Sequence, residues 1–358
     1  MSEITPNDLN ERLDMAAGHH RDGRAAVAKQ IYEAVQGIPC WPQQAAAFYL
    51  YGALAWESGA YQAARVALRK ALGIVRPEHL AWETDRISRG LGEKPYREAL
   101  ASIWDATYGV WCEKTFPVPR VRLETVGPCN RSCPYCPVSQ YARREGRLSE
   151  ALVLDIADQL GDLSYDGTIV FSLFNEPLLD KRLLNDFLPY LARKVPNAWP
   201  RIFTNGDPLT EDMTNLLFEA GLGDLIVSCH DRAAYARARR IKAALPADRR
   251  TRMMLSPYFK AGDGSGAVSL NTRTDTVSLA GYADDRIHPA TPYGCGAISF
   301  SIDYKAQVHP CCNDFLDGYV VGNAGERSLV AIWEAARDSF RAHFIGDFPT
   351  TVCHACVG

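Results

Sequence analysis

Three cysteines stand close together in the segment Cys129-Asn-Arg-Ser-Cys133-Pro-Tyr-Cys136, directly after the apolar-patterned run 121–126. A structural zinc site is closed by four ligands, whereas a centre held by three thiolates keeps one position open. Thiolates at such short spacing also ligate iron–sulfur clusters. The spacing therefore indicates a 4Fe–4S cluster with one open iron. A zinc site completed by a distant ligand, or three unrelated core thiols, are the alternatives.

A second group of cysteines occupies the C-terminal part of the chain. Between its members, the alternating run 298–311 predicts a β-hairpin, and a helix containing Ile332 and Trp333 should follow. One of the two adjacent cysteines would supply one of four ligand slots, so the group fits a closed metal centre, either a zinc ribbon or a fully ligated iron–sulfur cluster. The candidate ligands are Cys295, Cys311, Cys312, Cys353 and Cys356.

Composition limits the class of protein. The chain has 358 residues and a formal net charge of −3, which provides no global footprint for nucleic acid or a membrane surface. The N-terminus lacks a signal-like pattern, and no apolar run approaches the ~18 residues of a membrane span. We therefore expect a cytoplasmic protein, and in that reducing compartment eleven cysteines favour metal ligation over disulfides.

The elements that position these cysteines fall into distinct regions. Residues 1–116 show helical periodicity, and Tyr51, Gly52, Gly59 and Tyr61 belong to a repeat resembling a tetratricopeptide helix pair, with a second copy upstream and a degenerate third downstream. This region would bind a protein or peptide partner, or simply pack on the catalytic domain. We assign it as an all-α domain.

Strand and helix patterns alternate from about residue 117 to 290. Strands are expected at 120–126, 168–174, 201–204, 225–229 and 253–258, with helices near 149–161, 180–193, 210–220 and 232–244. Strands separated by helices predict a parallel sheet in an α/β fold, with functional residues at the carboxyl ends of its strands. The helices near 232–252 carry a strongly basic run, read as a solvated face or as a phosphate or carboxylate site.

The cysteine triplet, with Tyr135 before its last member, resembles the signature of the radical SAM superfamily. The resemblance implies a partial (β/α)6 TIM-like barrel and an open iron that chelates S-adenosylmethionine (SAM). It also implies SAM contacts by residues that match motifs in order along the strands: Tyr135, Glu176, Thr204, Asn205, Ser228 and, as a candidate for the SAM carboxylate, Arg252. Residues 291–358 resemble the SPASM or shorter twitch extension, which implies that their cysteines carry one fully ligated auxiliary 4Fe–4S cluster.

The resemblance implies an enzyme that cleaves SAM to a 5′-deoxyadenosyl radical and takes hydrogen from a carbohydrate-like small molecule, a sugar or aminocyclitol. Dehydrogenation would pass an electron to the auxiliary cluster, whereas epimerisation would need a thiol donor, for which Cys229 is the candidate. An external donor such as flavodoxin or ferredoxin would supply the reducing electron. Modification of a peptide is the competing function, and a non-enzymatic metal-binding scaffold is a further alternative.

Overall fold

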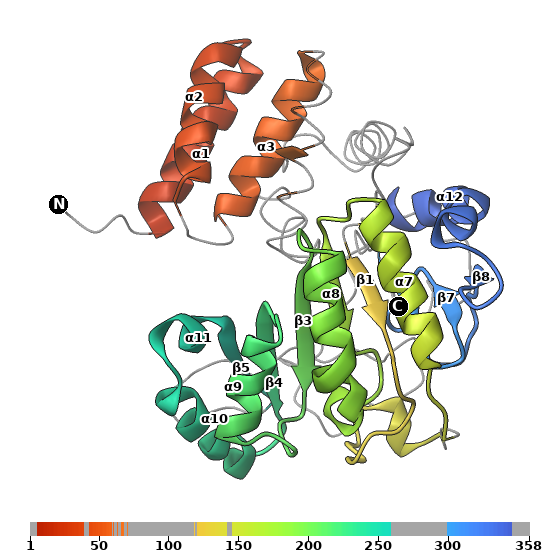
Figure 1. Cartoon of the computed structure of the whole chain (residues 1–358). Helices are drawn as coiled ribbons and strands as arrows, with labels where there is room; N and C mark the ends of the chain where they lie inside the picture. Colours follow the sequence, from red (N-terminus) through yellow and green to blue (C-terminus); the bar gives the residue numbers. More distant parts are fainter. Residues whose placement is uncertain are drawn as a thin grey trace. The chain divides into compact units, whose positions relative to one another are not determined.

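A parallel sheet forms the centre of the fold. The computed structural model describes residues 6–38, 43–58, 120–141, 145–258 and 299–345, together with isolated positions between 60 and 118. Its first five strands lie in the order β5-β4-β3-β2-β1, all parallel, and confirm the five predicted strands (Figure 1). They are β1 (Arg120–Leu123), β2 (Thr168–Phe171), β3 (Trp199–Thr204), β4 (Asp224–Cys229) and β5 (Met253–Pro257).

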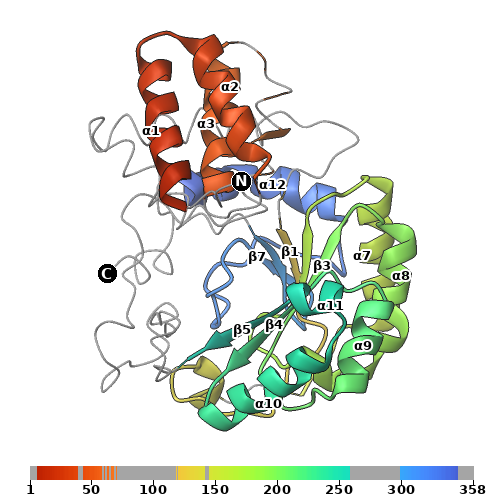
Figure 2. The ribbon, with the colours of Figure 1, turned by 90° about the vertical axis from the view of Figure 1, so that its left-hand side faces the viewer.

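Helices connect consecutive strands and follow one another along one side of the sheet (Figure 2). Their starts are set by side chains that accept a backbone N–H of the first turn: Ser149 for α7, Thr210 for α9 and Asp231 for α10. The α7 helix buries Val153 and Ile156 at helical spacing. The helices are α7 (Glu150–Asp162), α8 (Leu188–Lys194), α9 (Glu211–Glu219), α10 (Arg232–Ala244) and α11 (Ala247–Arg252), with short turns η1 (Pro137–Ser139), η2 (Pro177–Leu179) and η3 (Leu183–Phe187).

The predicted C-terminal hairpin is present and joins the same sheet. Strand β6 (Phe300–Ile302) pairs in parallel with β1, and β7 (Gln307–His309) and β8 (Gly322–Asn323) continue the sheet antiparallel. The predicted helix is α12 (Leu329–Ile345), whose Leu329 N–H donates to Gln159 Oε1 of α7 at 2.8 Å. The hairpin is therefore an extension of the parallel sheet, which the sequence pattern did not indicate.

Three helices form the described part of the N-terminal region: α1 (Pro6–Arg21), α2 (Ala25–Gln36) and α3 (Gln43–Glu57). Gly23 has φ +73°, a left-handed conformation that turns the chain between α1 and α2. The buried faces meet in an apolar core of Leu9, Leu13, Ala16, Ala28, Tyr32, Val35, Ala47, Leu50 and Leu54. The region is helical as predicted, and its tetratricopeptide character stays a prediction.

The chain divides into two compact units, one containing these N-terminal helices and the other the sheet. Several expectations lie outside the described residues: the third repeat copy, a further strand in segment 261–281, and Cys295, Cys353 and Cys356. The closed geometry of a (β/α)6 barrel and the domain limits 1–116, 117–290 and 291–358 likewise stay predictions. Among the described residues, no helix is long and apolar enough to cross a bilayer.

Candidate active site at the carboxyl edge of the sheet

The cysteine loop follows β1 at the carboxyl edge of the parallel strands, where functional residues were expected. Cys129, Cys133 and Cys136 are free thiols of intermediate exposure, and the Cys136 N–H donates to the Cys133 carbonyl at 2.9 Å. Burial raises the pKa of Cys129 and of Cys133. Three partly buried thiols on one short loop, held near one another, fit the ligand set of a cluster with one open iron.

Glu176, at the end of the β2 loop, ties that loop to β3. It is 1% exposed, and its Oε1 accepts hydrogen bonds from Thr204 Oγ1 at 2.7 Å and the Leu178 N–H at 3.1 Å. Its Oε2 accepts the Asn205 N–H at 2.7 Å. Burial raises the pKa of Glu176, whereas the hydrogen bonds from Thr204 and Asn205 lower it. Glu176 therefore braces two predicted SAM-binding elements, and its direct contact with SAM stays a prediction.

Asn205 connects β3 to the cysteine loop. Its Nδ2 donates to Asn130 Oδ1 at 2.7 Å and lies 3.9 Å from Cys129 Sγ. The next residue, Gly206, has φ +76°, and a Cβ there would lie 2.6 Å from Val227 Cγ1. Only glycine satisfies this close approach, which explains the Thr-Asn-Gly sequence at the strand end.

The segment Phe174-Asn175-Glu176-Pro177 resembles the Gly-Gly-Glu-Pro element of the radical SAM superfamily, with Phe174 and Asn175 in place of its two glycines. Phe174 donates its N–H to the buried Glu124 Oε1 at 2.8 Å, and the Asn175 Oδ1 accepts the Leu173 N–H at 3.1 Å. The Asn175 Nδ2 is buried and has no hydrogen-bond partner in the part of the chain that the structure describes. A buried donor without a partner is costly unless a ligand accepts from it, so this position fits a bound cofactor with acceptor atoms.

An ion-pair network, not anticipated from the sequence, fastens the cysteine loop to the ends of β3 and β4. Arg131 binds Asp207 through two nitrogens, at 2.5 and 2.6 Å, and Asp231 through a third at 3.0 Å. Arg237 of α10 donates to Asp207 at 2.7 Å. Arg131 first, and then Arg237, hold the pKa of Asp207 below its ordinary value. Such two-nitrogen contacts fix orientation as well as charge.

Tyr135 lies among aromatic rings from two other strand ends. Its hydroxyl is hydrogen-bonded to His230 Nδ1 at 2.5 Å, and its ring stacks on Tyr258 with a centroid distance of 5.5 Å. His230 and Tyr258 are also in contact, at 5.0 Å. Burial, with a smaller effect of Arg131, lowers the pKa of His230 to about 4. His230 is therefore neutral near pH 7, beside the loop expected to hold the cluster.

Two predicted site residues at the end of β4 differ in exposure. Ser228 is partly exposed, whereas Cys229 is fully buried, with its thiol 3.5 Å from the Val227 carbonyl. Burial raises the pKa of Cys229 to about 11. A buried thiol bonded within its own strand packs as a small hydrophobe. Its role as a hydrogen donor stays a prediction without support from its position.

The position of Arg252 differs from the one expected for a residue that binds the SAM carboxylate. It ends α11 immediately before β5, at the amino edge of the sheet, and donates to the Leu222 carbonyl at 3.0 Å. Its guanidinium also lies 4.7 Å from the centre of the Phe218 ring. The loops predicted to bind SAM leave the opposite edge, so Arg252 does not lie with them. Two other arginines of the basic run are paired with carboxylates of the chain, Arg249 with Glu219 and Arg237 with Asp207.

Two cysteines of the second group follow the hairpin and lie within the described residues. Cys311 is buried and Cys312 partly exposed, and both are free thiols. The loop that follows packs through Phe315 onto Phe174, with ring centres 4.9 Å apart, and onto Tyr141 at 5.8 Å. Phe174, which replaces a glycine of the family pattern, therefore links the loop before Glu176 to the loop after the cysteine pair.

Comparison with known families agrees with this arrangement. The model of the radical SAM superfamily matches residues 123–244, and that of the SPASM iron–sulfur cluster-binding domain matches 295–357. The chain belongs to the radical SAM superfamily. It is 31% identical, over 218 residues, to the S-adenosyl-L-methionine-dependent 2-deoxy-scyllo-inosamine dehydrogenase of Niallia circulans, a match covering 60% of this chain and 81% of that protein.

A solved structure shows the same similarity. The crystal structure of BtrN in complex with AdoMet and 2-DOIA superimposes with a TM-score of 0.58 and 26% identity, covering 68% of this chain and 94% of that chain. Domains of the two matched kinds carry 4Fe–4S clusters, as predicted for both cysteine groups. The residues that sequence reasoning missed, chiefly Arg131 and Asp207, lie inside or directly beside the motifs it identified.

Proposed function

We propose that this enzyme is a dehydrogenase that oxidises a hydroxyl-bearing carbon of an aminocyclitol or a closely related polyol to a ketone. The observation that carries the proposal is the similarity to most of the length of the inosamine dehydrogenase, in a chain whose cysteine loop and SAM motifs meet at one sheet edge. A peptide substrate gains no comparable support.

When bound, the cluster and SAM supply a 5′-deoxyadenosyl radical, which removes a hydrogen atom from an unactivated carbon. Oxidation to a ketone then requires the loss of one electron and one proton, and the predicted auxiliary cluster is the candidate electron acceptor. Cys129, Cys133 and Cys136 would hold the first cluster, and Cys295, Cys353, Cys356 and one of Cys311 and Cys312 the second.

The chain's own residues hold the cysteine loop and the predicted SAM-binding turn in place. Arg131 fastens the cysteine loop to β3 and β4, and Glu176 fixes the Thr204 and Asn205 turn beside Cys129. Holding reacting groups in one geometry lowers the entropic part of the barrier. Epimerisation would need a donor thiol facing the substrate, and the burial of Cys229 disfavours that outcome.

The test is anaerobic reconstitution followed by turnover of 2-deoxy-scyllo-inosamine and other aminocyclitols with a chemical reductant in deuterated solvent. We expect 5′-deoxyadenosine and a product two mass units lighter than the substrate. The triple variant Cys129→Ala, Cys133→Ala, Cys136→Ala should form neither. A product of unchanged connectivity carrying one deuterium would show epimerisation and contradict the proposal, as would reconstituted enzyme that releases 5′-deoxyadenosine but oxidises none of these substrates.

A further inference from the structure

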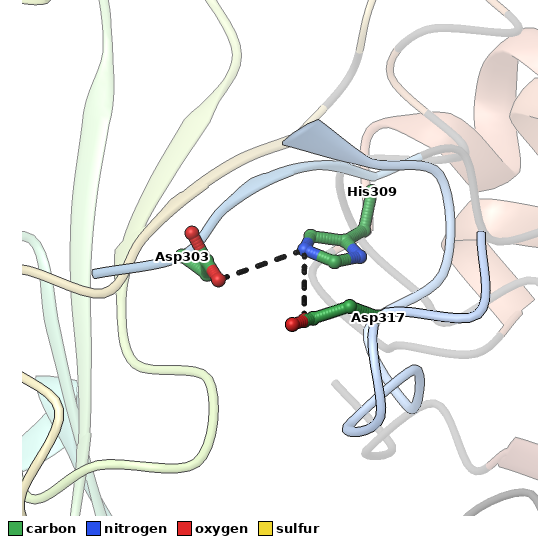
Figure 3. A group of neighbouring side chains, drawn as sticks. All are labelled: Asp303, His309 and Asp317. Atoms are coloured by element: carbon green, nitrogen blue, oxygen red, sulfur yellow. Dashed lines mark ion pairs between the residues drawn. The ribbon is translucent and has the colours of Figure 1, made fainter. Parts of the chain in front are cut away.

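A cluster of one histidine and two aspartates lies at the base of the C-terminal hairpin (Figure 3). Asp303 directly follows β6, His309 ends β7, and Asp317 lies in the loop beyond Cys312. His309 Nε2 lies 3.8 Å from Asp303 Oδ2 and 3.8 Å from Asp317 Oδ1. One ligand atom from each of the three residues falls within 4.8 Å of the others.

The imidazole is aimed into this cluster by a fourth residue. His309 is 1% exposed, and its Nδ1 is paired with Asp314 Oδ2 at 3.0 Å. Asp314 is itself fixed, since it accepts the backbone N–H groups of Gly318 and Tyr319 at 2.8 and 2.7 Å. The other nitrogen, Nε2, is buried and has no hydrogen-bond partner among the described residues.

Asp303 is equally constrained. Its Oδ1 accepts the N–H groups of Lys305 and Gln307 at 2.9 and 2.8 Å, which leaves Oδ2 facing the imidazole. The cluster thus places a buried nitrogen that makes no hydrogen bond among the described residues between two carboxylate oxygens at ion-pair distance, with a further carboxylate behind the ring. A metal-binding histidine typically has this arrangement, because a carboxylate on the second ring nitrogen fixes the tautomer and orientation.

We propose that Asp303, His309 and Asp317 bind a divalent first-row transition-metal ion through one imidazole nitrogen and two carboxylate oxygens, separately from the iron–sulfur clusters. Such mixed nitrogen and oxygen donors suit Mn²⁺ or Zn²⁺. Two donors bound at about 2.1 Å to one ion lie roughly 3.0–3.4 Å apart, so the observed 3.8 Å needs only a small closure.

The simpler alternative is an ion-pair cluster without a metal, in which Asp303 and Asp314 outweigh burial and raise the pKa of His309 to about 9, so that a protonated imidazole pairs with the carboxylates. Lys305 contacts Asp317, and its Nζ lies 3.9 Å from Asp303 Oδ2, so its ammonium already neutralises part of the negative charge. The Lys305 side chain is 43% exposed, so it can swing into water when an ion enters. Lys305 is therefore a competitor of the metal, and its removal separates the two explanations.

The position suggests a structural role for the ion. Cys311 and Cys312 follow His309 within three residues, and Phe315 between Asp314 and Asp317 packs on Phe174. A metal joining Asp303, which directly follows the strand paired with β1, to Asp317 would hold this loop on the sheet. It would thereby fix the cysteine pair relative to the loop that contains Glu176.

Binding of Mn²⁺ tests the inference on the anaerobically reconstituted full chain, because Mn²⁺ is a poor partner for thiolates and does not compete for the cysteine groups. The fall in the electron paramagnetic resonance signal of free Mn²⁺ measures occupancy and needs no turnover. We expect one saturable site per chain. Asp317→Asn should weaken it by at least about 10–100-fold, the loss that removing an outer-shell partner of a ligand already causes, and Lys305→Gln should tighten it.

Asp338→Asn is the matched control, since it makes the same charge change on an exposed position of α12 and should leave the affinity unchanged. Equal affinity in the parent and Asp317→Asn would overturn the proposal. So would the lack of a saturable site in both the parent and Lys305→Gln, which would leave an ion-pair cluster only. Neither result bears on the dehydrogenase proposal, because Mn²⁺ binding is measured without substrate or SAM.

Discussion

Both edges of the parallel sheet carry ion pairs between arginine and aspartate, but these pairs join different kinds of element. At the carboxyl edge, Arg131 joins the cysteine loop to Asp207 and Asp231, two carboxylates on loops that leave β3 and β4. At the amino edge, Arg201 of β3 binds Asp224 of β4 at 3.0 Å, a cross-strand pair between residues directly opposite in the register. The first contact positions a long loop, whereas the second joins two strands that are already paired.

The difference shows that strand direction decides which charged contacts serve the site. All loops that follow parallel strands leave from one edge, so side chains far apart in the sequence meet there. Contacts at the other edge contribute to stability alone. Variants matched across the two edges can break or sharpen this comparison.

Glu176→Gln should have the largest effect. The amide nitrogen of glutamine would replace one carboxylate oxygen and place a donor against either the Asn205 N–H or the Thr204 hydroxyl and the Leu178 N–H. We therefore expect a loss of about 2–3 kcal/mol in unfolding free energy together with loss of SAM cleavage. Urea unfolding and release of 5′-deoxyadenosine measure the two effects. Asp224→Asn at the amino edge should cost less than about 1 kcal/mol and retain cleavage, since its ion pair is partly exposed. Equal loss of cleavage in both variants would contradict the comparison.

Arg131→Ala should reduce assembly of the first cluster. The change removes the guanidinium from Asp231 and leaves Asp207 with Arg237 and the Asn130 amide, at a cost of about 1–2 kcal/mol discounted for partial exposure. Iron content and visible absorbance after reconstitution should fall. Arg131→Lys should be intermediate, because an ammonium cannot make the two-nitrogen contact. Arg201→Ala is the amino-edge control, and a matching loss of iron in that variant would show that the effect is merely global.

Protonation of His230, at the carboxyl edge, should make the free energy of unfolding depend on pH. Its pKa is about 4 in the folded chain and about 6.5 when unfolded. The unfolded state binds the proton more tightly, so the stability that neutral His230 contributes is present above pH 6.5 and is lost as the pH falls toward 4.

When the pH falls from about 7 to 5, the unfolding free energy of the cluster-free parent chain should therefore decrease by about 1–2 kcal/mol more than that of the His230→Asn variant. The groups that face His230 are Tyr135, Tyr258, Arg131, Asp207 and Asp231. Urea unfolding at a series of pH values measures the difference. Parallel pH profiles for the parent and His230→Asn would remove histidine protonation from the account of this edge.

The sequence was sufficient for elements with strong local signals. The strands from 120 to 257 alternate with capped helices, and the cysteine spacing and the motifs around Glu176 and Asn205 lie at the ends where they were predicted. Pairings between distant segments carry no such signal. The parallel contact of β6 with β1, the Arg131 to Asp207 ion pair and the packing of Phe315 on Phe174 each join residues more than 70 positions apart.

The misplaced residue illustrates the same limit. Arg252 was considered because a cation suits a carboxylate, but composition does not say which end of a strand a residue occupies. It precedes β5, so it belongs to the amino edge, whereas Tyr258, which follows β5 and contacts Tyr135, lies at the carboxyl edge. A strand of five residues is enough to separate the two.

Arg252→Gln should accordingly have the smallest effect. The variant loses a hydrogen bond to the Leu222 carbonyl and a contact with the Phe218 ring, which together predict a decrease of about 1 kcal/mol or less in stability. Because both partners belong to the amino edge, the dissociation constant for SAM, measured by equilibrium binding to the reconstituted enzyme, should equal that of the parent. Arg131→Ala measured in the same way supplies the contrast. Weaker SAM binding by Arg252→Gln at unchanged stability would mean that the two edges are coupled, and that the position of a residue along its strand is not sufficient to exclude it from the site.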